Sequence, residues 1–329
     1  MAITPRSYTS IFKHTLLAAT AFLTACAPVS TPSSPEQTPV AGLVRKAFAP
    51  TWSPSGEQVA FLYRYRAEGS QDVKDALFTI LQNGTDLVKV RNLSPARFQD
   101  LDWSPNGTLF LLTSEDTEEI YLTERNGQNL EKIAEGAQVS WHPTSDKFVS
   151  VFDNTCQEAD RVGGKQCRRQ IRLYDIPSRT HVALNVDLPR EVIAPHWSKD
   201  GLRISWLTTA TNETKELSER ILQLHNYNIA TETDQITEIQ TTDLSFANGA
   251  WSDDETQFAF NYLSRVYLYL FDSQESFEIT PGVQPALSND NNRILYTNLI
   301  GQNRGDIAVF DRSSERISTI ISHRDLPEL

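Results

Sequence analysis

A short motif built around tryptophan recurs along the 329 residues and constrains the fold more than any other feature. Residues 51–63 read TWSPSGEQVAFLY: a tryptophan, a Ser-Pro-Ser-Gly turn and a run of alternating apolar residues. Repeats spaced by 36 to 56 residues, as here, are typical of a propeller, a solenoid or an array. The copies, of which the last is weaker, are anchored at Trp52, Trp103, Trp141, Trp197, Trp251 and Leu287.

Each repeat has the pattern of four β-strands joined by tight turns. In the first repeat, strands are predicted at 48–52, 58–63, 76–81 and 87–93. Proline and glycine in the first turn supply the fixed and the positive φ that it needs, and Asn83-Gly84 is a strong hairpin signal. The later repeats keep this order, with third strands predicted at 119–124, 170–176, 221–229, 265–271 and 306–311.

A four-stranded antiparallel sheet cannot bury both of its faces alone, whereas six such sheets set radially pack face to face around a channel. We therefore predict an all-β fold, a six-bladed β-propeller of four-stranded antiparallel blades, over residues 43–329. In this fold the anchor residues fill the interfaces between blades, so they serve packing and do not form a binding site.

The pattern W-S-P-x-G-x-x-[VIL]-x-[FL] resembles the WD-like repeat of the TolB-type propellers of bacterial envelope proteins. Five clear copies and one degenerate copy carry the resemblance from about residue 45 to the C-terminus. It implies a six-bladed propeller with a binding or scaffolding role in the cell envelope, and it implies no catalytic residue. TolB has an α/β domain before its propeller, where this sequence predicts only a tether.

Residues 1–25 are predicted to be a lipoprotein signal peptide. Arg6 and Lys13 precede an apolar run at 16–23 that is too short to span a bilayer. The following LTAC resembles a bacterial lipobox, which implies cleavage before Cys26 and lipidation of its thiol; an ordinary signal peptide with an incidental cysteine is the alternative. We expect an exported protein that is lipid-anchored to the membrane. Ala27 fits outer-membrane sorting, or a periplasmic position, in a cell with two membranes.

Residues 26–42 follow as a lipidated cysteine and a Pro/Ser-rich tether, because this segment holds too little apolar surface to fold. Without residues 1–25 the chain has 28 Lys and Arg against 42 Asp and Glu, a net charge of −14. Such an acidic protein repels phosphate groups, so we expect no nucleic-acid partner.

Cys156 and Cys167 are the remaining cysteines, and in an exported protein they predict a disulfide. A metal site would need further Cys or His residues at ligand spacing nearby. The sequence has none there, so we expect no metal and no cofactor.

Three repeats have long connections between their second and third strands, at 64–75, 153–170 and 209–220. Such connections emerge on one face of a propeller, and repeat proteins often place insertions on the binding face. We hypothesise a docking rim, stiffened by the disulfide, although tolerated insertions explain the lengths equally well. The basic members of the docking rim are Arg64, Arg66, Lys74, Arg161, Arg168, Arg169, Lys215 and Arg220.

Catalytic motifs are sparse. No G-x-S-x-G elbow occurs, and HRDL at 323–326 lacks the companion motifs of a kinase. The Asp/Asn-rich segments 252–256 and 288–293 replace the Ser-Pro-Gly turn of other repeats, so we interpret them as turns and not as calcium loops. The candidates for the channel side directly precede anchors on the inner strands; they are Asp100, Asp102 and His196.

These observations favour a membrane-tethered, non-catalytic module that binds or scaffolds an envelope protein, peptide or glycan. The alternative is an envelope enzyme, a lyase or hydrolase with its site at the mouth of the propeller channel. Strongly perturbed carboxylates grouped in the channel would favour that enzyme. A structural subunit of a larger envelope assembly is a third reading.

Overall fold

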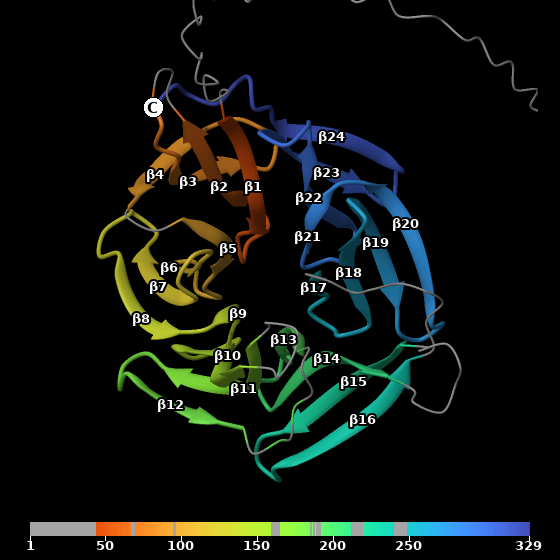
Figure 1. Cartoon of the computed structure of the whole chain (residues 1–329). Coiled ribbons are helices and arrows are strands. Elements are labelled where there is room, and N and C mark those ends of the chain that lie inside the picture. The colour runs from red at the N-terminus through yellow and green to blue at the C-terminus, as the bar shows by residue number, and fades with distance from the viewer. Residues whose placement is uncertain are drawn as a thin grey trace, which may run out of the picture. The chain divides into compact units, whose positions relative to one another are not determined.

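The computed structural model describes residues 44–66, 70–94, 97–158, 165–184, 186, 188, 192–211, 220–239 and 249–329. They belong to one compact unit, Ala41–Leu329. Within these ranges the secondary structure consists of 24 β-strands (Figure 1). In the same ranges, no helix has the length and apolar character needed to cross a membrane.

Most of the described strands form four antiparallel sheets of four strands each, in which consecutive strands are neighbours. The first two sheets contain β5 (Phe98–Trp103), β6 (Leu109–Ser114), β7 (Glu119–Glu124) and β8 (Glu131–Glu135), then β9 (Ala137–Trp141), β10 (Lys147–Glu158), β11 (Lys165–Asp175) and β12 (Thr180–Ala183). The next two contain β13 (Val192–Trp197), β14 (Arg203–Thr211), β15 (Arg220–Asn228) and β16 (Thr233–Ile239), then β17 (Gly249–Trp251), β18 (Gln257–Tyr262), β19 (Arg265–Leu270) and β20 (Glu275–Pro281).

The two ends of this unit share one eight-stranded sheet. Its strands are β1 (Val44–Trp52), β2 (Gln58–Arg66), β3 (Lys74–Leu81), β4 (Val88–Leu93), β21 (Val283–Leu287), β22 (Arg293–Leu299), β23 (Arg304–Asp311) and β24 (Arg316–Ile321). Six blades are predicted from the sequence; here the first and last groups of four strands are joined by a short parallel pairing of Arg45 with Arg304 and Lys46 with Gly305. Glycine permits this approach, because a Cβ at position 305 would lie 2.8 Å from the carbonyl oxygen of Ala47.

The sheets surround a common centre (Figure 1). The first strand of each group of four lies innermost, and these strands contact one another in the order β1, β5, β9, β13, β17, β21 and back to β1. The arrangement is therefore propeller-like, with a closed ring of first strands at its centre.

The packing role predicted for the anchor residues is confirmed, although an edge of each anchor also contributes to the lining of the central cavity. Buried side chains of the described residues form six apolar clusters, each of which joins two successive groups of four strands. Trp103, for example, packs with Leu62 and Leu77 of the preceding group, and its ring centroid lies 4.7 Å from that of Phe110. The five anchor tryptophans are only 5–8 % exposed, and Leu287 is partly buried against the sixth cluster.

The serine after an anchor closes the turn into the second strand. The Ser198 N–H donates to the Arg203 carbonyl oxygen (3.0 Å), and its Oγ accepts from the Arg203 N–H (3.0 Å). Gly201 has a φ of 71° in this turn. Asp254 and Asp290 accept hydrogen bonds from Ser252 and Ser288 of the corresponding turns, so the segments 252–256 and 288–293 do form turns.

The long connections differ from their prediction. Loops are predicted at 64–75, 153–170 and 209–220, but the described parts of these ranges largely extend the strands. In the longest of these hairpins, β10 and β11 pair from Lys147–Asp175 out to Glu158–Lys165. Cross-strand hydrogen bonding thus continues where the sequence no longer shows simple alternation of apolar and polar residues.

Residues 322–329 close the ring at the junction of β23 and β1. His323 lies 2.7 Å (Nδ1) from Oδ1 of buried Asp306, and its backbone N–H donates to the same oxygen (2.6 Å). Leu326 is buried in the cluster around Trp52, and the Tyr63 hydroxyl donates to the Pro327 carbonyl oxygen (3.2 Å). The segment HRDL is therefore a structural clamp.

Replacing Trp103 by Ala should lower the free energy of unfolding by about 3–5 kcal/mol, because it opens a cavity between two sheets. The measurement is urea denaturation followed by circular dichroism. Leu202→Ala is the control: this side chain is 60 % exposed, and its loss should change stability by less than about 0.5 kcal/mol. Equal effects of the two substitutions would contradict the packing role of the anchor.

His323→Ala should cost about 1–3 kcal/mol, because buried Asp306 loses a side-chain partner. The same denaturation experiment measures it, with the exposed neighbour Arg324→Ala as the matched control. A His323→Ala protein as stable as the control would show that the clamp contributes nothing to ring closure.

Candidate functional site

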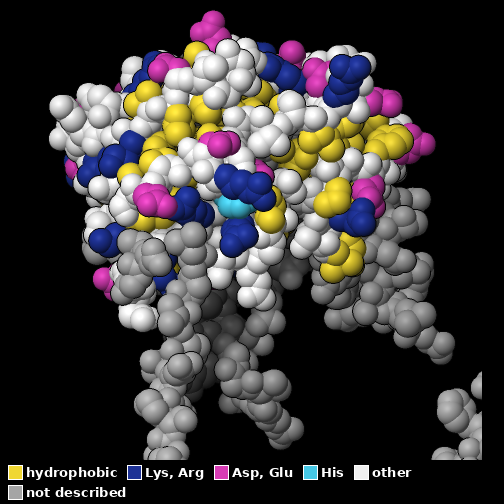
Figure 2. Space-filling view, turned by 90° about the horizontal axis from the view of Figure 1, so that it is seen from above, with side chains coloured by type: hydrophobic (Ala, Val, Ile, Leu, Met, Phe, Trp, Pro, Cys, Tyr) yellow, Lys and Arg dark blue, Asp and Glu magenta, His cyan; other side chains and the backbone are white. Residues whose placement is uncertain are grey.

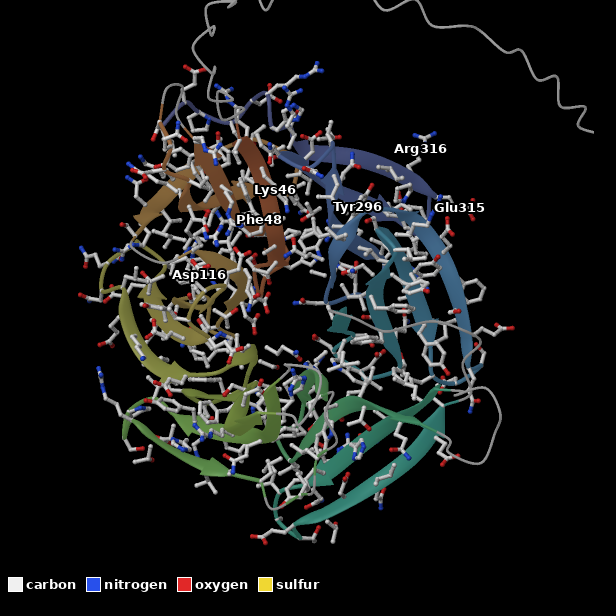
Figure 3. The ribbon with its side chains drawn as sticks, in the orientation of Figure 1. Lys46, Phe48, Asp116, Tyr296, Glu315 and Arg316 are labelled. Atoms are coloured by element: carbon white, nitrogen blue, oxygen red, sulfur yellow. The ribbon has the colours of Figure 1, made fainter. Side chains whose placement is uncertain are left out.

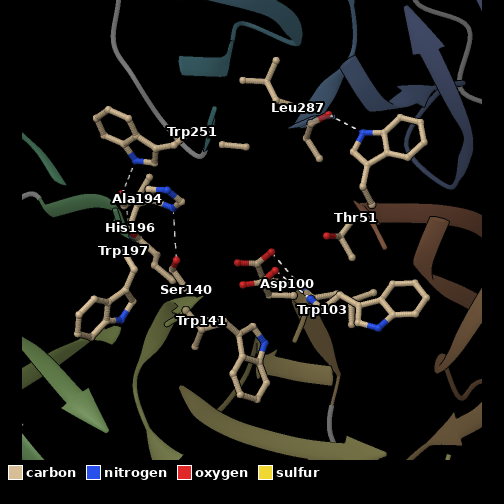
Figure 4. Close-up of a pocket in the computed structure, with 18 of the residues that line it drawn as sticks. Thr51, Asp100, Trp103, Ser140, Trp141, Ala194, His196, Trp197, Trp251 and Leu287 are labelled. Carbon is tan, nitrogen blue, oxygen red and sulfur yellow. Dashed lines mark hydrogen bonds between the residues drawn. The ribbon is translucent and has the colours of Figure 1, made fainter. Parts of the chain in front are cut away.

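A cavity of about 860 Å³ lies at the centre of the ring (Figure 4). Its lining comes from all six first strands, β1, β5, β9, β13, β17 and β21, and from the turns that follow them. No other element of the described chain contributes to it. The cavity is thus a direct product of the repeat.

Backbone bulges shape the cavity wall. Four residues that lie three positions before an anchor have positive φ: Ala49, Gln138, Ala194 and Gln284. The bulges free backbone N–H groups, which neighbouring strands satisfy: Ala49 donates to Oε1 of Gln284 (3.0 Å), and Ala194 to Oε1 of Gln138 (2.8 Å). Bulges re-aim side chains, and here they occur at the same offset from the anchor in four of the six inner strands.

The residues directly before the anchors all line the cavity; they are Thr51, Asp102, Ser140, His196, Ala250 and Ala286. Asp100 and Asp102 are two positions apart on β5, so both point to the same face of the strand. Of these six residues, the polar ones lie on β1, β5, β9 and β13, and those on β17 and β21 are alanines. Figure 4 shows the Asp100 carboxylate and the His196 ring directed inward, and the indole rings directed outward.

The two carboxylates are desolvated. Asp100 accepts a hydrogen bond from the Leu101 N–H (3.0 Å), and Asp102 accepts one from the Trp103 N–H (2.9 Å). Burial within the ring raises the pKa of Asp100 to about 6 and that of Asp102 to about 7, where the charge of Asp100 adds to the effect. The Asp100 side chain is nevertheless exposed to the water of the cavity and Asp102 is half-buried, so the raised pKa reflects the surrounding strands and not a dry site.

His196 is held neutral. Burial lowers its pKa to about 4, so at neutral pH the imidazole offers one donor and one acceptor. Its Nδ1 lies 3.4 Å from Oγ of Ser140, and its ring stacks on Trp251 with centroids 6.2 Å apart. In the described part of the chain, no three His, Cys, Asp or Glu side chains gather closely enough to hold a metal ion.

The structure therefore brings together Asp100, Asp102 and His196, the three channel-side candidates of the sequence analysis, in the lining of one cavity. Sequence reasoning missed Thr51, Gln138, Ser140 and Gln284. Their position relative to the anchor could have identified them, because residues at the same distance before the anchor line the cavity in one repeat after another.

Two described members of the docking rim are engaged in ion pairs. Arg64 pairs with Asp75 (Nε–Oδ1, 2.8 Å) and Glu115 (2.9 Å), and its guanidinium lies over the ring of Phe48, which Figure 3 labels on β1. Arg169 pairs with Asp153 (3.0 Å). Lys74 is exposed and Arg66 is half-buried. On the face seen in Figure 2, basic and acidic side chains are interspersed.

The other members of the rim lie outside the described residues, wholly for Arg161 and Lys215 and in their side chains for Arg168 and Arg220. The docking rim thus stays a prediction. So does the disulfide: the backbone register pairs Cys156 with Cys167, but their side chains are not described. Cys26 and the tether also fall outside the described residues.

Comparison with known proteins identifies the fold. Neither a protein-family model nor a curated protein matches this sequence. Among solved structures, TolB from Acinetobacter baumannii is similar with a TM-score of 0.57 and 15 % identity, over 85 % of this chain and 64 % of that chain. The chain thus spans less than two thirds of that TolB, and it has a TolB-type propeller fold.

Two enzymes of known structure have a similar fold, with TM-scores slightly below that of TolB. A puromycin-hydrolysing peptidase from Mycobacterium tuberculosis has a TM-score of 0.53 and 11 % identity, over 86 % of this chain and 54 % of that chain. Oligogalacturonate lyase from Vibrio parahaemolyticus has a TM-score of 0.51 and 10 % identity, over 85 % of this chain and 79 % of that chain. At such identities the similarity concerns the fold alone.

The raised pKa of Asp102 predicts how stability depends on pH. Between about pH 4 and pH 7 the native carboxyl keeps a proton that the unfolded chain has released, so its contribution to stability is lost as pH rises through this window. Asp102→Asn removes this dependence. At pH 8 we expect its Tm to exceed that of the wild type by roughly a few degrees, with the difference shrinking toward pH 4.

Thermal unfolding at a series of pH values measures this difference. His196 titrates in both proteins, so its opposite pH dependence cancels in the comparison. Asp272→Asn, at an exposed turn, is the control and should shift Tm equally at all pH values. A pH-independent difference between Asp102→Asn and wild type would refute the desolvation of Asp102.

Proposed function

We propose that this protein is a lipid-anchored, six-bladed propeller of the bacterial cell envelope that binds a segment of another protein in its central cavity and performs no chemistry. One observation carries the proposal: a closed ring of six first strands surrounds a cavity of about 860 Å³ whose lining mixes apolar surface with a few polar side chains. Ligand sites of proteins have this size and this mixture of apolar surface and few polar groups.

Six blades are the natural division of the described sheets. The chain has six anchors, and its described residues form six apolar clusters, each between successive groups of four strands. The parallel ladder between β1 and β23 has only two residue pairs, whereas each group of four is held by longer antiparallel ladders along its strands. We therefore treat the eight-stranded sheet as two blades that touch at one edge.

The envelope location rests on the N-terminal sequence and on the fold. The lipobox-like LTAC and the Pro/Ser-rich segment to residue 42 support export, lipidation at Cys26 and a tethered propeller. The similarity in fold to TolB agrees with a periplasmic protein that binds another protein.

A polypeptide suits the cavity better than a glycan does. Sugar rings are commonly held on exposed aromatic faces, but the anchor tryptophans reach the cavity lining only by their edges, since they are 92 % or more buried. The wall instead offers carboxylates, a neutral imidazole and hydroxyl groups, beside small side chains that leave room for a chain.

One observation favours an enzyme as the second candidate. Carboxyls with pKa values of about 6 and 7 in one cavity are suited to general acid–base catalysis near neutral pH. The lyase and the peptidase that share the fold show that such propellers occur in enzymes. For this candidate, Asp100 and Asp102 would be the proton-transfer groups.

Site-specific photo-crosslinking in intact envelopes tests the proposal. A photoreactive residue in place of Ala250, on the cavity wall, should give a crosslinked polypeptide of defined mass. The same residue in place of Val182, 67 % exposed on the outer strand β12, is the matched control and should not give that product. Adding Ala286→Trp, which narrows the cavity, should reduce the yield at least tenfold.

The outcomes separate the candidates. The absence of a polypeptide product at position 250, or the same product from position 182, contradicts binding in the cavity. A carbohydrate that crosslinks at position 250 in the Asp102→Asn variant, but not in the wild type because the active protein cleaves it first, would support the enzyme.

A further inference from the structure

We infer that the ligand places a lysine ammonium or arginine guanidinium group between Asp100 and Asp102. This inference rests on the proposed function, because it names the chemistry of the segment that enters the cavity.

Above about pH 7, where both carboxyls are ionised, the charge of the cavity is negative and uncompensated. Its charged lining residues are Asp100, Asp102, Asp253 and Lys199. Lys199 and Asp253 lie on the turns at one mouth and pair with each other (Nζ–Oδ2, 3.5 Å). Within the described chain, neither Asp100 nor Asp102 has a basic side chain at ion-pair distance. A cation from a partner is therefore the group that these two carboxylates lack.

The geometry of β5 suits a cation on a side chain. Alternate residues of a strand are roughly 6.5 Å apart, so the two carboxylates flank a space that one ammonium or guanidinium group can fill. Their hydrogen bonds within the described residues come from backbone N–H groups. A guanidinium offers five donors and an ammonium three, enough to serve both carboxylates.

The remaining walls fit the rest of such a side chain. His196 is neutral at pH 7, so the titratable group on β13 does not repel a cation. Ala250 and Ala286 on the opposite wall are small and leave space for a peptide backbone. The aliphatic stem of lysine or arginine packs well on such apolar surface while its head meets the carboxylates.

Two other ligand classes fit less well. An anion would be repelled by the carboxylates. The lysine among the described lining residues, Lys199, is already paired with Asp253. A metal ion usually requires more ligands than these two carboxylates provide, and no third metal-binding side chain joins them among the described residues.

Calorimetric titration of the full chain with short peptides tests the inference. The probes are Ac-Ala-Lys-Ala-NH₂ and Ac-Ala-Arg-Ala-NH₂, with the norleucine peptide as the neutral control of equal length. At pH 8 we expect at least one basic peptide to bind tenfold or more tightly than the norleucine peptide. Affinity should fall as pH decreases from 8 to 5, because both carboxylates then take up protons.

The double variant Asp100→Asn, Asp102→Asn should lose this preference, whereas Asp272→Asn should keep it. If the double variant does not fold, each single variant and the pH series of the wild type replace it. Equal binding of basic and norleucine peptides, or an unchanged preference in the variants, would overturn the inference. Ca²⁺ or Mn²⁺ alone, binding more tightly than the peptides and displacing them, would overturn it in favour of a metal site.

The crosslink from position 250 distinguishes this failure from failure of the proposed function. If a polypeptide crosslinks there but basic peptides do not compete with it, the cavity binds a partner and only the cationic chemistry is wrong. If no polypeptide crosslinks and no peptide binds, both proposals fail.

Discussion

Apolar packing between sheets is the interaction on which the whole described structure depends. Each group of four strands carries large buried side chains on both faces, and neither face can leave water unless another sheet covers it. A ring satisfies every face at once, because each sheet covers its neighbour. The anchor residue matters most, since it sits in the contact with the preceding sheet and also marks the start of the next turn.

Closure of the ring has a consequence at its centre. The inner edge of each first strand has no fifth strand to pair with, and its backbone groups still need partners. Bulges at positions such as Ala49 and Ala194 turn these groups toward glutamines on neighbouring strands. The unpaired inner edges of the first strands thus form the wall of a cavity, and the side chains just before the anchors line it. Structure and candidate site share one origin.

Much of this could be predicted from the sequence, because the repeat is periodic and its signals are local. The strand predicted at 119–124 coincides with β7, and the turn role of Ser198 follows from its place after Trp197. The loop predicted at 153–170 was wrong in its described parts, because hairpin length depends on pairing between strands and not on alternation within one. Asp100, Asp102 and His196 were placed on inner strands by their offset from the anchors.

The sequence by itself determined the repeat: which residues alternate, where the chain turns, and which large side chain each unit must bury. Only the tertiary structure decided which positions within a repeat face the central cavity. Asp102, Ser140 and His196 lie on separate strands up to 94 positions apart, and ring closure alone brings them into one cavity. The pKa values of the carboxyls depend on the same closure, since desolvation by neighbouring strands is a property of the assembled ring.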